Sequence, residues 1–145
     1  MTQFYIAGPF FNCYEIEVVN IIKNKLESLG FEVFSPMHKF MCPPTASPGV
    51  RKNTFDGNLV AIEDSDYIIV ITDNKDLGTL FEAGYAYKCN KKIIYFSQTL
   101  GNNPFNLMLA QSGICITTSY ERLFSVLSDI KNNIPIDSKF SGQIE

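Results

Sequence analysis

The chain has 145 residues, a formal net charge of −3 and a pI of about 5.1, and 46% of its residues are hydrophobic against 19% charged. This balance is typical of a globular protein, and we expect one domain over residues 1–145. The lack of a basic block argues against a nucleic-acid polymer as a partner, and no apolar run approaches the ~20 residues of a membrane helix. Four scattered cysteines without a CxxC motif argue against a zinc site and favour a cytoplasmic location.

Strands and helices are predicted to alternate along the chain. Short apolar runs that end at turn residues predict the strands, and apolar side chains spaced by three and four residues predict the helices. In chain order we expect a strand at 4–7, a helix at 13–29 closed by Gly30, a strand at 31–34, a helix at 52–65, a strand at 67–72, a helix at 79–89, a strand at 92–96, a short helix at 105–111, a strand at 114–117 and a helix at 120–130. This order is typical of an α/β fold, and five strands favour a doubly wound, flavodoxin-like parallel sheet.

Two segments lie outside this regular pattern. Residues 36–51 contain four prolines and are expected to form an irregular loop. Because Met37, Phe40 and Met41 are too apolar for a solvated linker, we favour a loop that folds over a pocket. The polar residues 136–145 are expected to form a loosely held tail.

Ligands of doubly wound sheets bind beyond the carboxyl ends of the strands. Two carboxylates six residues apart, Asp76 and Glu82, follow the third predicted strand at such an edge. Residues 79–82 fit a capping box in which Glu82 only stabilises the start of a helix. A carboxylate in the first helical turn also stays ionised beside the positive helix end, and it can then act as a nucleophile. Spacing alone leaves both interpretations open.

Asp76 itself has two interpretations. It is either a turn-forming residue before Gly78 or an acid that protonates a leaving group. Two carboxylates with opposite roles are typical of retaining glycosyl transfer. Asp64 and Asp73 are expected to be solvated or capping residues.

The segment from Tyr5 to Phe11 carries neither a GxGxxG motif nor the residues of a phosphate loop. Its small residues Gly8 and Pro9, followed by Phe10 and Phe11, suit the floor of a site for a flat ring. A strand end followed by core aromatics explains the same pattern equally well.

Four segments together resemble the nucleoside 2-deoxyribosyltransferase family, namely residues 5–11, 58–66, 76–86 and 106–108. The most specific is residues 76–86, with the pattern D-x-G-T-x-x-E-x-G-Y-A, and the resemblance extends over about residues 3–115. It implies a flavodoxin-like transferase that needs no metal or organic cofactor.

The resemblance also implies roles for individual residues. Glu82 would be the nucleophile, Asp76 would lie beside the base as the leading proton donor, and Tyr5 would hold the nucleophile in place. Substrate contacts are expected from Gly8, Pro9, Phe10, Phe11, Asn58, Gly78, Thr79, Asn106 and Met108.

Two of these positions carry further implications. Asn106, with Met108 close by, would reach the sugar 5′ end in the site of a neighbouring subunit, which implies a dimer or a larger oligomer. Asn58 stands where many family members have Asp. Because an amide cannot protonate a base, more of that task would fall on Asp76 or on solvent.

The expected activity is exchange of the base of 2′-deoxynucleosides through a covalent 2-deoxyribosyl intermediate on Glu82, with retention of configuration. Nucleosides and free nucleobases would be the partners. One alternative is a hydrolase of nucleosides or deoxynucleoside 5′-monophosphates on the same fold. A 5′-phosphate would need groups such as Arg51, Lys52 or Ser97, so nucleosides are favoured. The second alternative is a nucleotide-binding module without turnover, in which Glu82 is only a cap.

Overall fold

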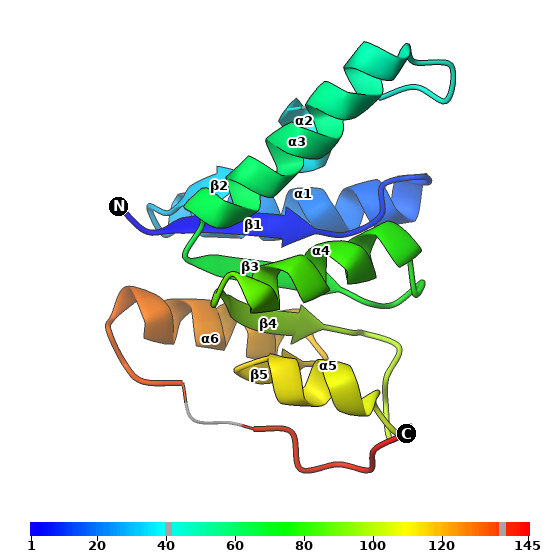
Figure 1. Cartoon of the computed structure of the whole chain (residues 1–145). Coiled ribbons are helices and arrows are strands. Elements are labelled where there is room, and N and C mark those ends of the chain that lie inside the picture. Colours follow the sequence, from blue (N-terminus) through cyan, green and yellow to red (C-terminus); the bar gives the residue numbers. More distant parts are fainter. Residues whose placement is uncertain (40–41, 137–138) are drawn as a thin grey trace.

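The computed structural model describes residues 1–39, 42–136 and 139–145. Five parallel strands form one sheet in the order β2-β1-β3-β4-β5 (Figure 1). The strands are β1 (Gln3–Ala7), β2 (Glu32–Phe34), β3 (Tyr67–Ile71), β4 (Lys92–Phe96) and β5 (Cys115–Thr117). This order is that of a flavodoxin-like α/β fold, and it confirms the predicted fold class.

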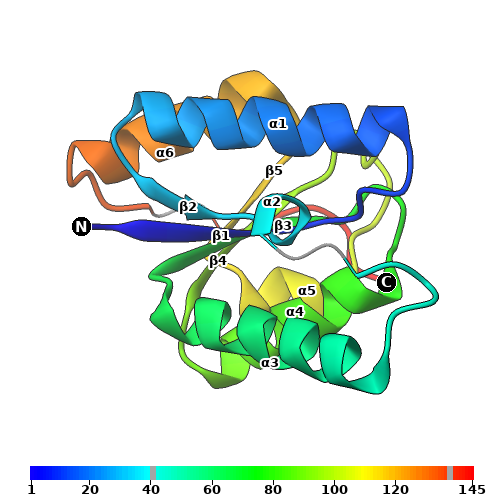
Figure 2. The same cartoon turned by 90° about the horizontal axis from the view of Figure 1, so that it is seen from above.

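Helices cover both faces of the sheet (Figure 2). One face carries α1 (Cys13–Ser28) and α6 (Tyr120–Lys131). The other face carries α3 (Pro48–Asp64), α4 (Leu77–Lys88) and α5 (Leu107–Ser112), and the short α2 (Pro36–Lys39) follows β2. Because the strands are parallel, the loops that leave β1, β3 and β4 all lie at the same edge of the sheet.

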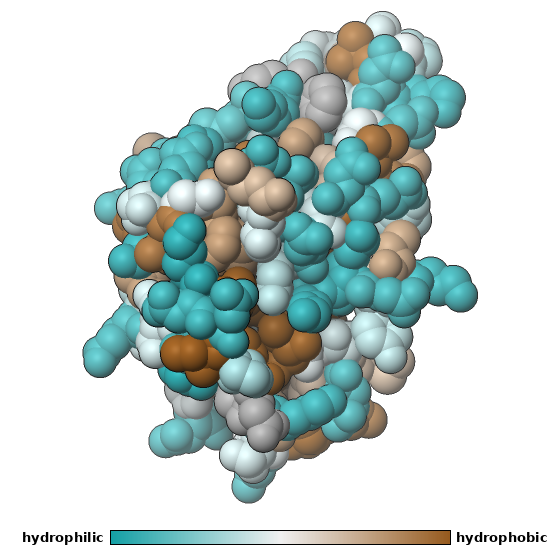
Figure 3. Space-filling view, turned by 90° about the vertical axis from the view of Figure 1, so that its left-hand side faces the viewer, coloured by the Kyte–Doolittle hydropathy of each residue, from teal (hydrophilic) through white to brown (hydrophobic). Residues whose placement is uncertain are grey.

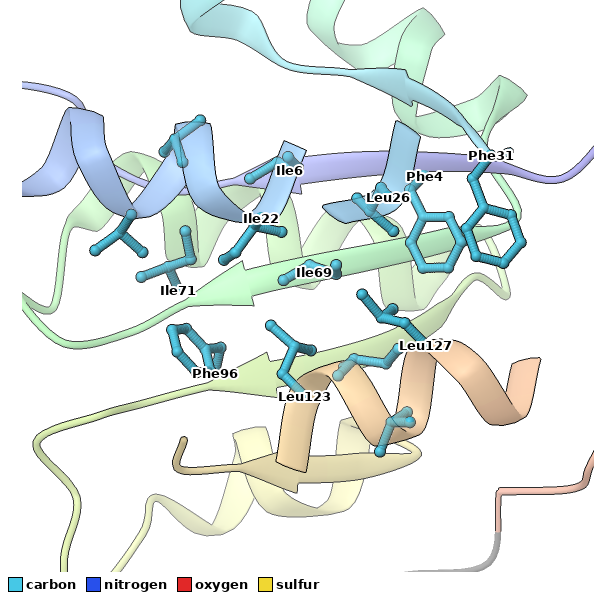
Figure 4. Packing of buried hydrophobic residues seen from close by; sticks show 14 of the residues in the cluster. Phe4, Ile6, Ile22, Leu26, Phe31, Ile69, Ile71, Phe96, Leu123 and Leu127 are labelled. Carbon is cyan, nitrogen blue, oxygen red and sulfur yellow. The ribbon is translucent and has the colours of Figure 1, made fainter. Parts of the chain in front are cut away.

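The core between the sheet and the pair α1 and α6 is built from large apolar side chains (Figure 4). Ile22 and Leu26 of α1 and Leu123 of α6 are fully buried against β1, β3 and β4. Residues 68–71 are buried on both faces, as expected for a central parallel strand. The rings of Phe4 and Phe31 close this core with centroids 4.8 Å apart.

The core on the opposite face positions α4. Ala83 and Ala86 of α4 are buried among Tyr5, Val70 and Tyr95 of the sheet. Because alanine side chains are short, α4 packs close to the sheet, and a longer neighbouring side chain on the same helix can reach β1.

Capping residues confirm one predicted helix end and shift one predicted helix start. Gly30 follows α1 with a φ of +84°, which confirms its predicted role. Helix α3 begins at Pro48 and not near residue 52, because Ser47 accepts a hydrogen bond from the backbone N–H of Val50 and proline suits the first helical position. The predicted irregular loop is therefore shorter and contains α2. The pocket-covering loop was predicted from three apolar residues. Met37 is half-buried and packs against the core, and Phe40 and Met41 lie outside the described residues.

The prediction of a loosely held C-terminal tail is wrong for its last residues. The N–H of Phe105 donates to the carbonyl of Gln143 (2.9 Å), and the N–H of Glu145 donates to the carbonyl of Phe105 (3.0 Å). The ring of Phe140 packs edge-on against Phe105, with centroids 5.8 Å apart. The tail thus extends along the segment that precedes α5, and backbone hydrogen bonds hold it there.

The end of the sheet where the strands begin, on the left in Figure 1, faces the viewer in Figure 3. This surface is mostly hydrophilic, with a small apolar area in its lower part. In the parts of the chain that the structure describes, no helix has the length and apolar character needed to cross a bilayer.

Candidate active site

Helix α4 begins with a carboxylate cap. Asp76 is its N-cap residue, and Oδ2 of Asp76 accepts hydrogen bonds from the backbone N–H of Thr79 (2.9 Å) and from the Thr79 hydroxyl (2.8 Å). Of the two interpretations of Glu82 that spacing left open, the capping box over residues 79–82 is therefore wrong. Aspartate is the better N-cap residue, so the helix starts earlier and Glu82 is its sixth residue, counted from Leu77.

Glu82 reaches from α4 to the sheet. The Tyr5 hydroxyl donates a hydrogen bond to Oε2 of Glu82, joining α4 to β1 across 77 positions of the sequence. Tyr5 is fully buried, and its ring stacks on Phe34 with centroids 5.4 Å apart and planes 9° apart. The contact lies between β1 and the helix that follows β3. These strands are neighbours at the point where the strand order reverses, which is where flavodoxin-like folds bind ligands.

The surroundings of Glu82 change its proton affinity. Burial raises the pKa of Glu82 from 4.5 to about 7; the hydrogen bond from Tyr5 opposes this rise, and the charge of Asp76 adds to it. Glu82 is in the second turn of α4, so the prediction that the helix end keeps it ionised is wrong: burial dominates. Burial and the charge of Glu82 raise the pKa of Tyr5 far above its ordinary value, so Tyr5 stays a proton donor.

The segment after β1 forms one wall of this edge. A Cβ on Gly8 would lie 2.8 Å from Cδ1 of Ile71, so glycine allows β1 to leave the sheet close to β3. Pro9 is buried, and the rings of Phe10 and Phe11 stack with centroids 6.2 Å apart. Phe11 is 80% exposed, so one face of this ring pair is open for contact with a flat ligand.

Asn58 and Thr79 differ in what they offer a ligand. Asn58 lies on α3 one turn before the fully buried Ile62, and its Oδ1 is buried without a hydrogen-bond partner among the described residues. Such an atom is an open acceptor. Thr79 is 1% exposed and its hydroxyl is engaged by Asp76, so we assign it to holding Asp76. Gly78 is exposed at the start of α4.

Asn106 and Met108 lie on the other side of α4. In Figure 1, α4 stands between α3 and α5, and Asn106 caps α5. Oδ1 of Asn106 accepts from the N–H groups of Met108 (2.9 Å) and Leu109 (3.2 Å), which leaves the side-chain amide N–H groups as donors for a ligand. Both Asn106 and Met108 are exposed, and the structure does not join them to the Tyr5–Glu82 pair within one chain.

Two acidic residues at this edge have partners that sequence reasoning missed. Asp73 is half-buried and not simply solvated: its Oδ1 accepts from the backbone N–H (2.8 Å) and the hydroxyl (2.9 Å) of Thr99. Asp73 and Asn106 line a pocket of about 620 Å³ between α4 and α5. Glu15 is 7% exposed and follows Asn12 by three residues. This capping-box spacing was the signal that could have identified it.

The side chains that commonly bind metal ions are dispersed. Cys13 and Cys42 are exposed, Cys89 is half-buried and Cys115 is buried, and all four are free thiols. Across residues 1–39, 42–136 and 139–145, no three His, Cys, Asp or Glu side chains lie close enough together to hold a metal ion.

Comparisons with known proteins agree with this geometry. Residues 4–119 match the model of a family described as nucleoside 2-deoxyribosyltransferase. A search of curated protein sequences gave no match. Among solved structures, a 2-deoxyribosyltransferase from Bacillus psychrosaccharolyticus is 26% identical with a TM-score of 0.76, and the match covers 96% of this chain and 100% of that chain.

Two further solved structures share the fold. A conserved protein from Enterococcus faecalis is 17% identical with a TM-score of 0.76, over 90% of this chain and 99% of that chain. A CMP N-glycosidase from Clostridium botulinum is 20% identical with a TM-score of 0.60, and the match covers 88% of this chain and 98% of that chain. Because the family model matches most of the chain, including Tyr5, Asp76 and Glu82, the protein belongs to the nucleoside 2-deoxyribosyltransferase family.

Proposed function

We propose that the protein exchanges the base of 2′-deoxynucleosides by transferring the 2-deoxyribosyl group to a second nucleobase. The observation that carries this proposal is the half-buried carboxylate of Glu82, hydrogen-bonded by Tyr5 and close to Asp76 at the carboxyl edge of the sheet. Family membership and the likeness to a solved 2-deoxyribosyltransferase support it.

In the first step, Glu82 attacks C1′ of the deoxynucleoside. Tyr5 binds Oε2, which leaves Oε1 as the attacking oxygen. As the C1′–O bond forms, the bond from C1′ to the base breaks and its electron pair leaves with the base. The base takes a proton from Asp76 or from solvent, because the amide of Asn58 has no acidic proton to give.

In the second step, a nitrogen of the incoming base attacks C1′ from the face that the first base has left. The bond from C1′ to Glu82 breaks, and the electron pair returns to the carboxylate. The incoming base releases its proton to Asp76 or to solvent. Two inversions at C1′ preserve the β configuration, as in other double-displacement glycosyl transfers.

Glu82 must be ionised to attack. Because burial raises its pKa to about 7, a substantial fraction of the free enzyme carries a neutral Glu82 at pH 7. The Tyr5 hydroxyl favours the anion, since a donor stabilises the charged form of a carboxylate. The rate of the first step is therefore expected to rise as the pH increases through about 7.

Nucleosides fit the site better than 5′-monophosphates. Nε of Arg51 donates to the Ala46 carbonyl (2.8 Å), and Nζ of Lys52 pairs with Asp56 (2.7 Å). The Ser97 hydroxyl lies 3.4 Å from Oδ1 of Asp73. All three groups expected to recognise a phosphate already have partners within the chain.

We also propose that two copies of the chain complete each site. Met108 is 75% exposed beside the capping Asn106, and Leu77 and Phe81 on α4 are 83% and 55% exposed. Apolar side chains exposed on neighbouring helices are typical of protein interfaces. A second copy would bring Asn106 and Met108 to the sugar 5′ end. Met108→Glu is therefore expected to yield a smaller particle in light scattering and to lower turnover.

The activity is tested by incubating the protein with thymidine, with and without adenine, and separating the products. Deoxyadenosine that forms only when adenine is present supports transfer. Free thymine and deoxyribose without an acceptor would replace this proposal by the hydrolase, the activity named for the Clostridium botulinum neighbour. If wild-type protein turns over none of several deoxynucleosides, the binding-module alternative replaces both. Glu82→Gln controls for contaminating activity.

A further inference from the structure

Glu15 is a buried carboxylate that the proposed reaction does not use. Its side chain is 7% exposed, and its two oxygens bind two separate loops. Oε1 accepts the backbone N–H of Phe11 (3.0 Å) in the β1–α1 loop, and Oε2 accepts the side-chain amide of Asn74 (2.5 Å) in the β3–α4 loop. The first loop carries the ring pair of Phe10 and Phe11, and the second leads directly to Asp76 and α4.

Helix capping accounts for only part of this arrangement. Asn12 already caps α1 by accepting the N–H of Glu15 (2.9 Å), and the bond from Glu15 to Phe11 completes that cap. The bond to Asn74 adds nothing to α1 and spans 59 positions of the sequence. It connects the loops that follow the neighbouring strands β1 and β3 at the edge of the sheet where the candidate site lies.

The loop held by Asn74 is conformationally strained. Lys75, between Asn74 and Asp76, has a φ of +49°, and its N–H closes a turn onto the Thr72 carbonyl (3.0 Å). A left-handed conformation costs a residue with a side chain about 1 kcal/mol or more, and it persists where surrounding contacts hold it. The contact between Glu15 and Asn74 is such a restraint, placed two residues before the cap of α4.

We propose that Glu15 is a positioning residue that locks the β1–α1 loop to the β3–α4 loop through Phe11 and Asn74. The lock fixes the ring pair relative to Asp76 and Glu82, and so the position of a bound base relative to the nucleophile. Its effect on turnover rests on the proposed function, but the lock itself has a readout that does not depend on catalysis.

A charge-swap cycle tests the lock. Asn74→Asp places a second carboxylate against Glu15, so the two loops are expected to separate. Glu15→Gln alone keeps both contacts, because the Asn74 amide can turn and accept from the new amide. The double variant Glu15→Gln/Asn74→Asp restores a donor and an acceptor at the contact. Asn24→Asp adds the same charge at an exposed position of α1 and serves as the matched control.

The readouts are hydrogen exchange at the Phe11 amide, kcat and KM. For Asn74→Asp we expect exchange about tenfold faster or more, and kcat lower by about tenfold to a hundredfold with a smaller change in KM. We expect near wild-type exchange and near wild-type kinetics for three variants: Glu15→Gln, the double variant and Asn24→Asp. If Asn74→Asp does not fold, Asn74→Ala breaks the same contact without the added charge.

The lock is overturned if Asn74→Asp or Asn74→Ala leaves the exchange of the Phe11 amide unchanged. It is also overturned if the double variant is as impaired as Asn74→Asp, because the effect would then not pass through Glu15. Fast exchange with unchanged kcat would show a loop contact without a role in positioning. If wild-type protein has no turnover, the proposed function fails, and the exchange data alone decide whether Glu15 joins the loops.

Discussion

Helix α4 takes part in two tyrosine–glutamate hydrogen bonds with different surroundings. Inside the molecule, Tyr5 of β1 donates to Glu82 of α4; at the surface, Tyr85 of α4 donates to Glu63 of α3. Burial raises the pKa of Glu82 to about 7, whereas in the surface pair the hydrogen bond to Glu63 raises the pKa of Tyr85 to about 12. Desolvation is the largest cause of the pKa shift in the inner pair, whereas the hydrogen bond itself is the largest cause in the surface pair.

This difference indicates which pair can carry chemistry. A carboxylate that loses most of its water and gains a single donor is destabilised as an anion, and the folding of the chain must offset that cost. Such a cost is typical of functional sites, where a reactive group is held in place at the expense of stability. Glu63 is exposed and accepts a hydrogen bond from a tyrosine as Glu82 does, so it is the natural control for Glu82.

The largest expected difference between the two pairs is the effect of their glutamates on turnover. Glu82→Gln is expected to lower base exchange by about a thousandfold or more, because an amide cannot form the covalent intermediate. Glu63→Gln removes the surface carboxylate and is expected to leave kcat within about twofold. Product formation from thymidine and adenine measures both. Equal rates for the two variants would remove Glu82 from the mechanism.

Glu82→Gln should also change stability: the substitution that lowers turnover is expected to raise the free energy of unfolding. Because its folded pKa lies above the ordinary value of 4.5, the unfolded chain releases this proton more readily. The ionisation of Glu82 therefore lowers stability as the pH rises from about 4.5 through 7. Relative to wild type, Glu82→Gln is expected to gain up to about 3 kcal/mol at pH 8 and much less at pH 4. Urea unfolding at both pH values measures this gain, with Glu63→Gln as the exposed control.

The pair of Tyr5 and Glu82 also differs from the surface pair in having Asp76 nearby, whose charge contributes to the raised pKa of Glu82. Asp76→Asn is expected to move the acid limb of kcat/KM to lower pH, and to reduce the plateau by about a hundredfold if Asp76 transfers the proton. Asparagine is an equally good N-cap residue, so Tm should change little. A pH–rate profile gives both the position of the acid limb and the height of the plateau. An unchanged plateau would mean that solvent, and not Asp76, protonates the leaving base.

Tyr5 is expected to have the smallest effect. Tyr5→Phe removes the hydrogen bond that lowers the pKa of Glu82, so the acid limb of kcat/KM should move to higher pH. Turnover at pH 7 should fall by about tenfold, in line with the loss of a hydrogen bond to a charged group. Tyr85→Phe removes the equivalent surface bond and should leave the profile in place. A shift of the acid limb to lower pH in Tyr5→Phe would contradict the assigned role.

Periodicity predicted the fold well because local pattern and burial agree in this chain. The continuous apolar run at residues 67–72 was predicted to be a central strand buried on both faces, and residues 68–71 are buried in β3; Gly30 follows the end of α1 as expected. Spacing could not place the start of α4, since Asp76 and Thr79 are both capping residues and only the folded helix shows which one is used. The position of the tail could not be predicted, because backbone hydrogen bonds to Phe105 hold its last residues and such bonds leave no pattern in the side chains.

The candidate site was less predictable from local pattern. Tyr5 and Glu82 are 77 residues apart, and only the family resemblance paired them before the fold was known. The raised pKa of Glu82 depends on how closely α4 packs on the sheet, which no short segment encodes. The bond between Glu15 and Asn74 likewise joins distant residues, although the capping-box spacing marks Glu15.

Trapping the covalent intermediate tests the central proposal most directly. Wild-type protein is mixed with a 2′-deoxynucleoside without an acceptor base, quenched rapidly in acid and analysed by intact and peptide mass spectrometry. We predict a mass increase of one 2-deoxyribosyl group on the peptide that contains Glu82, absent from Glu82→Gln and present in Glu63→Gln. Base release without any adduct, or an adduct on a different residue, would contradict the proposed role of Glu82.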